Sequence, residues 1–464
     1  MRPARACVNP HLLALTSLGD VITVPGYLPA FSMQKIPMPI HEKPLLIDNC
    51  GQLLTLQGEN RPRRGREMGK LELIKNGAVL IRNGVISSIG PAHRVRTNSQ
   101  ARHVTTLDAE GRVVMPGFVD SHTHALFAGS RVGEYVARIQ GVTYEDIATT
   151  GGGIHASAKR MRTASLPVLV EYLQQTARQF LEYGTTTIEV KSGYGLEFSQ
   201  ELKMLQAIRA AAGHLDLDVV ATLLFHDVPT RFTRQRSEFL RRAVRELIPC
   251  VARKGLAEFC DVFCDRGYFS VSETTQLLNA ASREGLALKL HSEQLTHSGS
   301  ASLAAGLGAV SVDHLDHVRA TDIKRMTKSG TIATLLPGTN LHLGDARYPP
   351  ARQLIDSGVP VALATNFNPG SSPTLNMQLI LSLACSSMRM SPAEAIVAAT
   401  INGAHAVKRG DRVGSLEIGK QGDLVMMDVS DYREIPYFFG MNHCLHVIKK
   451  GRVVWSKGHN GIHS

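Results

Sequence analysis

The sequence has no apolar run long enough to cross a membrane. A transmembrane helix needs roughly 20 consecutive apolar residues, and no stretch of the chain approaches that length. Hydrophobic residues still make up 43% of the 464 residues and charged residues 20%, the balance of a globular protein with a sizeable core. These absences exclude an integral membrane protein and a disordered chain, and we expect no membrane partner.

Cysteines and aromatic residues are also scarce. The seven cysteines are scattered and form no Cys-x-x-Cys pair, which excludes a disulfide framework and a structural zinc site and favours the reducing cytoplasm. Aromatic residues make up 5% of the chain, and no base-stacking motif accompanies the net charge of +11. We therefore expect a cytoplasmic protein that binds no nucleic acid.

The two ends of the chain share a strand-like pattern. Residues 1–43 lack periodicity and fit neither a secretion signal nor a transit peptide, so we expect a disordered N-terminal extension. Short β-type runs follow over 44–112, with Asn-Gly turn signals at 76–77 and 83–84, and the pattern returns over 406–464. The two segments predict one small β-sandwich domain formed by both chain ends.

Between these ends, residues 113–405 alternate strand-like and helix-like stretches. Apolar runs rich in β-branched residues occur at 113–119, 185–190, 219–225, 259–263, 286–290, 309–313, 331–336 and 359–365. Amphipathic segments separate most of them, for example 166–184, 198–213 and 272–285, and two more, 373–389 and 392–408, follow the last run. Eight strands alternating with helices predict a (β/α)8 barrel, an α/β fold of the TIM-barrel type.

Histidines stand where these strands end. Five of them follow strand-like runs: His122 and His124 after the first, His226 after the third, His291 after the fifth and His314 after the sixth. Residues two apart in a strand point to the same side, so the first two imidazoles share a face. Barrel enzymes place their active sites at the C-terminal ends of the strands. The pattern therefore predicts a metal-dependent or catalytic site there.

Three of these imidazoles match the ligand set of a catalytic metal. His122, His124 and His291 supply three neutral nitrogen ligands and leave a position open. Such an ion is a strong electrophile and activates water for attack on an amide or amidine carbon. His314 is a candidate for moving protons, and Arg131 for binding a substrate carboxylate through its guanidinium.

The combination of motifs resembles the amidohydrolase superfamily and, within it, the imidazolonepropionase family of histidine degradation. The resemblance rests on PGFVDSHTHALFAGSR, GGGIHAS, KSGYG, ELKML, DVFCDRGYFS, HSEQL, DHL, TLLPGT and ATNFNPGSSPT, and covers about residues 45–455. It implies a hydrolase that opens the imidazolone ring of imidazolonepropionate to N-formimidoyl-L-glutamate. It also implies one divalent or trivalent metal per chain, zinc or iron, and we expect a homodimer.

The resemblance assigns roles residue by residue. The metal ligands it implies are His122, His124, His291 and the residue at position 366. The catalytic residues are His314, Asn366 and Gln294. The substrate-binding residues are Arg131, Tyr194, His226, Gln294, Asn368, Gly370 and Ser371.

One position departs from the family pattern. After the eighth strand the family has an aspartate that binds the metal and accepts a proton from the attacking water, whereas this chain has Asn366. An amide oxygen can contact a metal, but it carries no charge and cannot act as a base. The substitution leaves the predicted binding pocket intact and predicts impaired catalysis.

Two other functions fit parts of the same pattern. One is a different cyclic-amide hydrolase or a heterocycle deaminase of the superfamily, in which a carbamylated Lys191 would bridge two metal ions. The other is a non-catalytic homologue that binds a carboxylate ligand without turnover, as Asn366 suggests. A metal count would distinguish the first, and binding without ring opening would identify the second.

Overall fold

Eight parallel strands form the central sheet of the structure, a computed structural model that describes residues 43–98, 104–142 and 152–458. In chain order the strands are β6 (Phe118–Asp120), β7 (Thr185–Lys191), β8 (Asp218–Phe225), β9 (Phe259–Cys264), β10 (Ala287–Ser292), β11 (Ser311–His314), β12 (Ile332–Leu335) and β13 (Val361–Leu363). Each strand pairs with the next along the chain. The predicted (β/α)8 barrel is confirmed.

The barrel is closed just beyond the ends of its first and last strands. The backbone N–H of Asn366 donates to the carbonyl of His122 (3.0 Å), and that of His124 donates to the carbonyl of Phe367 (2.9 Å). The N–H of Thr365 donates to the Asp120 carboxylate at 3.1 Å. These bonds bring the predicted ligand at position 366 next to the His-x-His segment.

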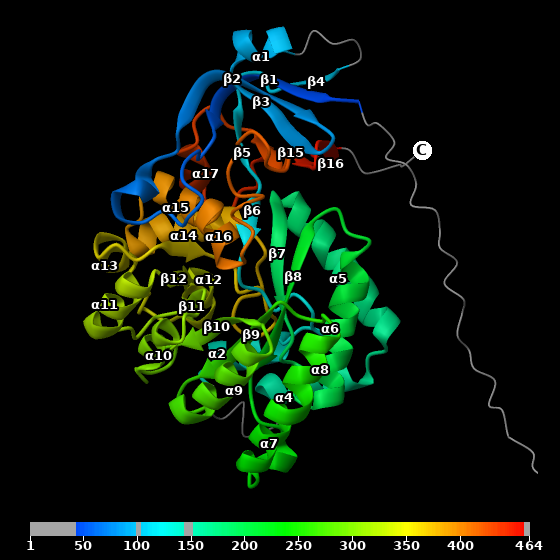
Figure 1. The fold of residues 1–464 in the computed structure, drawn as a ribbon, viewed down its shortest axis with the longest axis vertical. Coiled ribbons are helices and arrows are strands. Elements are labelled where there is room, and N and C mark those ends of the chain that lie inside the picture. Colours follow the sequence, from blue (N-terminus) through cyan, green and yellow to red (C-terminus); the bar gives the residue numbers. More distant parts are fainter. Residues whose placement is uncertain (1–42, 99–103, 143–151, 459–464) are drawn as a thin grey trace, which may run out of the picture. The chain divides into compact units, whose positions relative to one another are not determined.

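Helices follow most of the strands and cover the barrel (Figure 1). They are α2 (Val132–Ile139), α4 (Gly153–Thr163), α5 (Leu166–Glu182), α6 (Phe198–Ala212), α7 (Arg236–Arg242), α8 (Ile248–Arg253), α9 (Val271–Arg283), α10 (Ser300–Gly306), α11 (Ala320–Ser329), α12 (Pro337–Leu343), α13 (Ala351–Asp356), α14 (Met377–Met388), α15 (Pro392–Ala398) and α16 (Ile401–Ala406). Single turns η2 (Thr230–Phe232) and η3 (Ala243–Leu247) complete them. No helix of the described residues is long and apolar enough to span a membrane.

Local sequence explains where several of these helices begin. Ser270 caps α9 by accepting from the N–H of Glu273, whose carboxylate accepts the N–H of Ser270 in return. Ser391 and Glu394 form the same capping box at α15. A reciprocal cap satisfies two N–H groups that the helix itself leaves unpaired.

A second sheet combines strands from both ends of the chain, as predicted. Its N-terminal strands are β1 (Leu45–Leu54), β2 (Leu73–Arg82), β3 (Val85–Pro91), β4 (Thr105–Asp108) and β5 (Val113–Pro116), and its C-terminal strands are β14 (Leu424–Met427), β15 (Cys444–Lys449) and β16 (Arg452–Ser456). The order is β16-β15-β14-β5-β1-β2-β3, with β4 paired to β1. Figure 1 shows the blue and orange-red strands together. The short elements η1 (Gly65–Gly69), α1 (Ala92–Asn98) and α17 (Glu434–Tyr437) lie in the same chain segments.

Two expected boundaries differ from the structure. Residues 113–119 do not form one barrel strand, because β5 pairs with β14 of the second sheet and only β6 joins the barrel. The chain passes between them at Gly117, where a Cβ atom would lie 2.3 Å from the Thr186 hydroxyl. The turn signal at 83–84 does join β2 to β3, with both residues at positive φ, whereas 76–77 lies inside β2. The predicted extension 1–43 falls almost entirely outside the described residues.

Candidate metal centre and active site

Four buried histidines gather at the C-terminal ends of the barrel strands. His122, His124, His291 and His314 are each at most 3% exposed. The ring centroids of His122 and His291 are 4.5 Å apart, and those of His124 and His291 are 5.4 Å apart. His314 completes the group, with its ring centroid 5.3 Å from that of His291. The structure thus brings together histidines that are up to 192 residues apart in the sequence.

The spacing of the ring nitrogens suits a small metal ion. The Nε2 atoms of His124 and His291 are 3.4 Å apart. Two nitrogens bound at about 2.0–2.1 Å in a tetrahedral zinc site lie roughly 3.3–3.4 Å apart. One ligand nitrogen each from His122, His291 and His314 also lies within 4.8 Å of the others. The sequence assigned His314 a proton-transfer role, and its position allows either role.

Buried carboxylates lie next to the Nδ1 atoms of two of these imidazoles. Asp313 Oδ2 is 2.6 Å from Nδ1 of His122, and Asp261 Oδ2 is 2.9 Å from Nδ1 of His291. Both carboxylates are fully buried. The hydrogen bond to Asp313 fixes the tautomer of His122 that leaves its Nε2 available to a metal, whereas Asp261 lies close to His291 Nδ1 without hydrogen-bond geometry. Sequence reasoning missed Asp261 and Asp313. The sequence did contain a signal for them, because Asp261 in DVF and Asp313 in SVDH are single acidic residues within apolar strand-like runs.

Burial keeps these imidazoles in the form that binds metal. Desolvation lowers the pKa of His122, His124 and His291 well below the ordinary value and lowers the pKa of His314 to about 4. All four rings are therefore neutral near pH 7, and neutral imidazole is the metal-binding form.

Unsatisfied polar atoms provide a second test of the fit. Among the described residues, His122 Nε2 and Asn366 Oδ1 are buried and have no hydrogen-bond partner. Asn366 Nδ2 donates to the Thr339 hydroxyl at 2.9 Å, which fixes the orientation of the amide. A buried polar atom left unpaired costs about 1–3 kcal/mol, and a bound cation would remove that cost. The residues present fit a metal ion.

The carboxylate beside His291 gives a direct prediction. Asp261→Asn should weaken zinc affinity about 10–100-fold, the usual effect of losing such a partner. The affinity is measured by competition with a chromogenic chelator. Asp265→Asn is the control, because Asp265 is also buried but accepts from the N–H groups of Leu295 and Thr296 instead of a histidine. Equal affinities of Asp261→Asn and the parent protein would contradict the role.

A cavity of about 550 Å³ opens beside the histidines. It is lined by nearly every residue that the sequence assigned to metal, substrate or catalysis: His124, Arg131, Tyr194, His226, His291, Gln294, His314, Asn366, Asn368, Gly370 and Ser371. His122 is not in the lining, but its ring packs against that of His291. Arg138, Arg266 and Phe263 also line the cavity, and among the residues that the structure describes no aspartate or glutamate does. An anionic substrate suits this lining.

Arg131 lies at the N-terminus of α2 and is held by Glu134. Its Nε is 2.8 Å and its Nη2 2.5 Å from Glu134 Oε2, and the other carboxylate oxygen accepts the N–H of Gly153. A Cβ atom at Gly370 would lie 2.1 Å from Arg131 Nη1. Glycine at that position therefore lets the guanidinium approach the loop after β13.

That loop is built around Asn368. Its Oδ1 accepts the N–H groups of Gly370 and Ser371, both at 2.8 Å, and its Nδ2 donates to the Asn366 carbonyl at 2.6 Å. The N–H groups of these two residues, which the resemblance assigns to substrate binding, are thus already bonded to Asn368. The Ser371 side chain remains among the cavity-lining groups.

Tyr194 and His226 line the cavity beside His124. Their ring centroids are 6.1 Å apart and lie 5.7 and 6.0 Å from that of His124. Burial lowers the pKa of His226 to about 4, so this ring is neutral near pH 7. A flat heterocycle can pack against these rings beside the metal ligands.

Lys191 is placed differently from the carbamylated lysine considered above. Its Nζ lies 2.8 Å from Glu189 Oε2 and 2.8 Å from Asp261 Oδ2, and all three side chains are fully buried. Nearby carboxylates raise the pKa of this amine above its ordinary value. A protonated amine is not a nucleophile towards carbon dioxide, so these contacts disfavour a carbamate.

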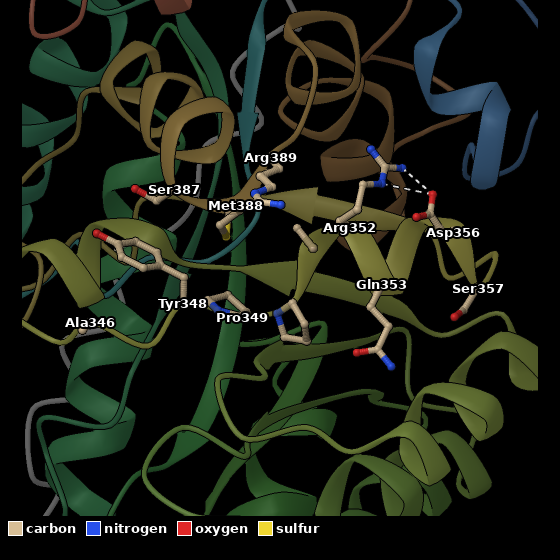
Figure 2. Close-up of a pocket in the computed structure, with 12 residues that line it drawn as sticks. Ala346, Tyr348, Pro349, Arg352, Gln353, Asp356, Ser357, Ser387, Met388 and Arg389 are labelled. Carbon is tan, nitrogen blue, oxygen red and sulfur yellow. Dashed lines mark hydrogen bonds and ion pairs between the residues drawn. The ribbon is translucent and has the colours of Figure 1, made fainter.

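Another hollow of about 690 Å³ lies between α13 and the end of α14 (Figure 2). The described residues that line it include none of the predicted site residues and no histidine. Its Arg352 is paired with Asp356 at 2.9 Å. This hollow therefore offers no metal ligands of the kind found in the histidine-lined cavity.

Comparison with known proteins agrees with this geometry. Residues 113–454 match the amidohydrolase family model. The imidazolonepropionase of Geobacillus kaustophilus is 45% identical over 90% of this chain and 99% of its own, and that of Solibacter usitatus is 43% identical over 88% and 98%. Among solved structures, the 5-methylcytosine deaminase of Klebsiella pneumoniae has the same fold, with a TM-score of 0.68 at 17% identity, covering 90% of this chain and all of that one.

Identity at this level over nearly the whole length of the relatives exceeds what a shared barrel alone produces, and the solved structures below 25% identity support the fold only. The chain therefore belongs to the amidohydrolase family and, within it, to the imidazolonepropionases.

Proposed function

We propose that this protein hydrolyses imidazolonepropionate to N-formimidoyl-L-glutamate, using one zinc or iron ion per chain. The observation that supports this proposal is a single cavity that is lined by His124, His291 and His314 and by the residues assigned to the substrate. The names of its relatives support the substrate. Six free cysteines among the described residues agree with a reducing cytoplasm, and the homodimer stays a prediction.

The ion would be held by His122, His124, His291 and the amide oxygen of Asn366. When bound, it supplies a Lewis acid that lowers the pKa of water towards neutrality. The chain itself positions the substrate: Arg131 binds the propionate carboxylate, and Tyr194 and His226 contact the ring. A charge-assisted pair of this kind fixes orientation as well as affinity.

His314 is the residue to which we assign proton transfer during ring opening. Ring opening requires a base to take a proton from the attacking water and an acid to protonate the departing ring nitrogen. His314 lines the cavity beside His291 and offers an imidazole for both steps. Asn366 occupies the place of the family's carboxylate but has no basic atom. We therefore assign the proton transfer to His314 and expect slow turnover.

Arg131 gives the test of substrate orientation. Arg131→Ala should weaken binding of a carboxylate-bearing analogue by about 1.5–3 kcal/mol, roughly 10–150-fold, because a hydrogen-bonded ion pair is lost. Zinc content should be unchanged. The matched control is the same analogue without its carboxylate, which both proteins should bind equally. An equal loss for both analogues would show that the substitution disturbs the pocket rather than one contact.

The proposal as a whole is tested by supplying imidazolonepropionate to purified zinc-loaded protein and following N-formimidoyl-L-glutamate. Formation of this product confirms the function. Asn366 favours a second candidate, a homologue that binds the ligand without turnover. Saturable binding with no product would support that candidate and overturn the first. Ammonia release from heterocyclic amines would instead indicate a deaminase.

A further inference from the structure

Five ionisable side chains lie beneath the histidine cluster with no exposure to solvent. They are Glu189, Lys191, Asp261, Lys289 and Asp313, from strands β7, β9, β10 and β11. Three carboxylates thus face two ammonium groups inside the barrel. Charges buried this deeply are retained only when they are paired, so their arrangement defines a specific electrostatic site.

The two lysines do not occupy equivalent positions. Lys191 Nζ is 2.8 Å from Glu189 and 2.8 Å from Asp261, and 3.7 Å from Asp313. Lys289 Nζ stands farther away, 3.5 Å from Glu189 and 3.8 Å from Asp313, and donates to the carbonyl of Ser121 at 2.9 Å. Lys191 is therefore the ammonium in direct contact with the carboxylates.

The groups around Lys191 could serve a metal ion. One ligand atom each from His122, Glu189 and Asp313 lies within 4.8 Å of the others, and Asp261 approaches the same ammonium. Two of these carboxylates also touch ligands of the histidine centre, Asp313 at His122 and Asp261 at His291. A second cation bound here would thus be held by the same carboxylates that contact the ligands of the first metal.

We propose that the ammonium of Lys191 is an internal cation in the place of a second metal ion, and that it limits this centre to a single metal. It engages the carboxylate oxygens that a second ion would need, and its charge repels a dication at short range. The inference rests on the metal centre of the proposed function but not on its substrate, so metal content and ring opening test the two separately.

The experiment counts metal ions after Lys191→Met. Parent and variant are saturated with zinc, passed through a desalting column and analysed by inductively coupled plasma mass spectrometry. We expect one zinc per chain for the parent and two for Lys191→Met. Lys289→Met is the matched control, because it removes the same charge from the same network but leaves the Lys191 contacts. It should keep one zinc, and a single zinc in Lys191→Met would overturn the proposal.

Two further measurements keep the proposal falsifiable if Lys191→Met does not fold. Lys191→Arg retains a cation and should bind one zinc, so two zinc ions in this variant would contradict the proposal. The parent protein is also titrated with excess zinc in ¹³C-bicarbonate. A second equivalent bound, or a carbamate carbon signal, would overturn the proposal, and the two together would indicate a metal bridge at a carbamylated lysine. One equivalent without that signal supports the internal cation.

Discussion

Asn366→Asp should raise the rate of ring opening at least about tenfold at saturating zinc. The parent site lacks a carboxylate next to the attacking water, and general-base catalysis is typically worth 10²–10⁴-fold. The structure accepts the change, since Thr339, which now accepts from Asn366 Nδ2, can turn its hydroxyl to donate to a carboxylate. The rate is measured as product formed per zinc-loaded chain.

Asn366→Ala provides the control for this prediction. It removes the amide oxygen that has no other partner and supplies no base, so zinc affinity should fall and the rate should not rise. An unchanged or lower rate in Asn366→Asp, at full zinc occupancy, would mean that the proton transfer by His314 or another group is already as fast as a carboxylate would make it. It would then refute our account of the asparagine.

Lys449→Met should lower the free energy of unfolding by about 3–5 kcal/mol, the cost of breaking a buried ion pair from one side. Lys449 Nζ lies 2.6 Å from Asp423 and 2.8 Å from Asp218, and it donates to the carbonyl of Thr186. Its side chain is 3% exposed and that of Asp423 2%. The ammonium joins β15 of the second sheet to barrel strands, so its loss leaves a buried carboxylate unpaired between them.

The neighbouring lysine is the control. Lys450 also approaches Asp218, at 3.6 Å, but its side chain is 51% exposed. Exposed pairs contribute little, so Lys450→Met should change stability by about 0.5 kcal/mol or less. Both variants are compared with the parent by urea unfolding followed by circular dichroism. Equal urea midpoints for the two variants would show that the ion pairs of Lys449 do not stabilise the contact between the two sheets.

The sequence predicted the parts of the site that follow from periodicity. Each site histidine comes at or just after the end of an apolar strand-like run, and parallel barrel strands bring their ends to one face. That rule suffices to bring His122, His226 and His291 together. The family motifs added Arg131, Tyr194 and Asn368. These residues lie in loops, and hydrophobic periodicity does not predict the conformation of a loop. Their placement around one cavity depends on loop geometry such as the Asn368 turn.

The carboxylates behind the histidines could not be predicted in the same way. Asp261 and Asp313 occupy strand positions where an apolar side chain is usual, and their partners come from other strands. The contact between Asp313 and His122 joins residues 191 positions apart, and its existence depends on the closed barrel. The division at Gly117 was missed for a related reason, because one continuous apolar run supplies strands to two different sheets.

The shared sheet has a consequence for synthesis on the ribosome. β5 pairs with β1 on one side and with β14 on the other, and β14 is made roughly 300 residues later. At about 5–20 residues per second, that delay is some 15–60 s. During this time one edge of Val113–Pro116 has no partner strand, and unpaired apolar edges promote aggregation. A chain truncated before Leu424 would carry this defect permanently, so chaperone dependence should be greatest for nascent chains that have not reached this point.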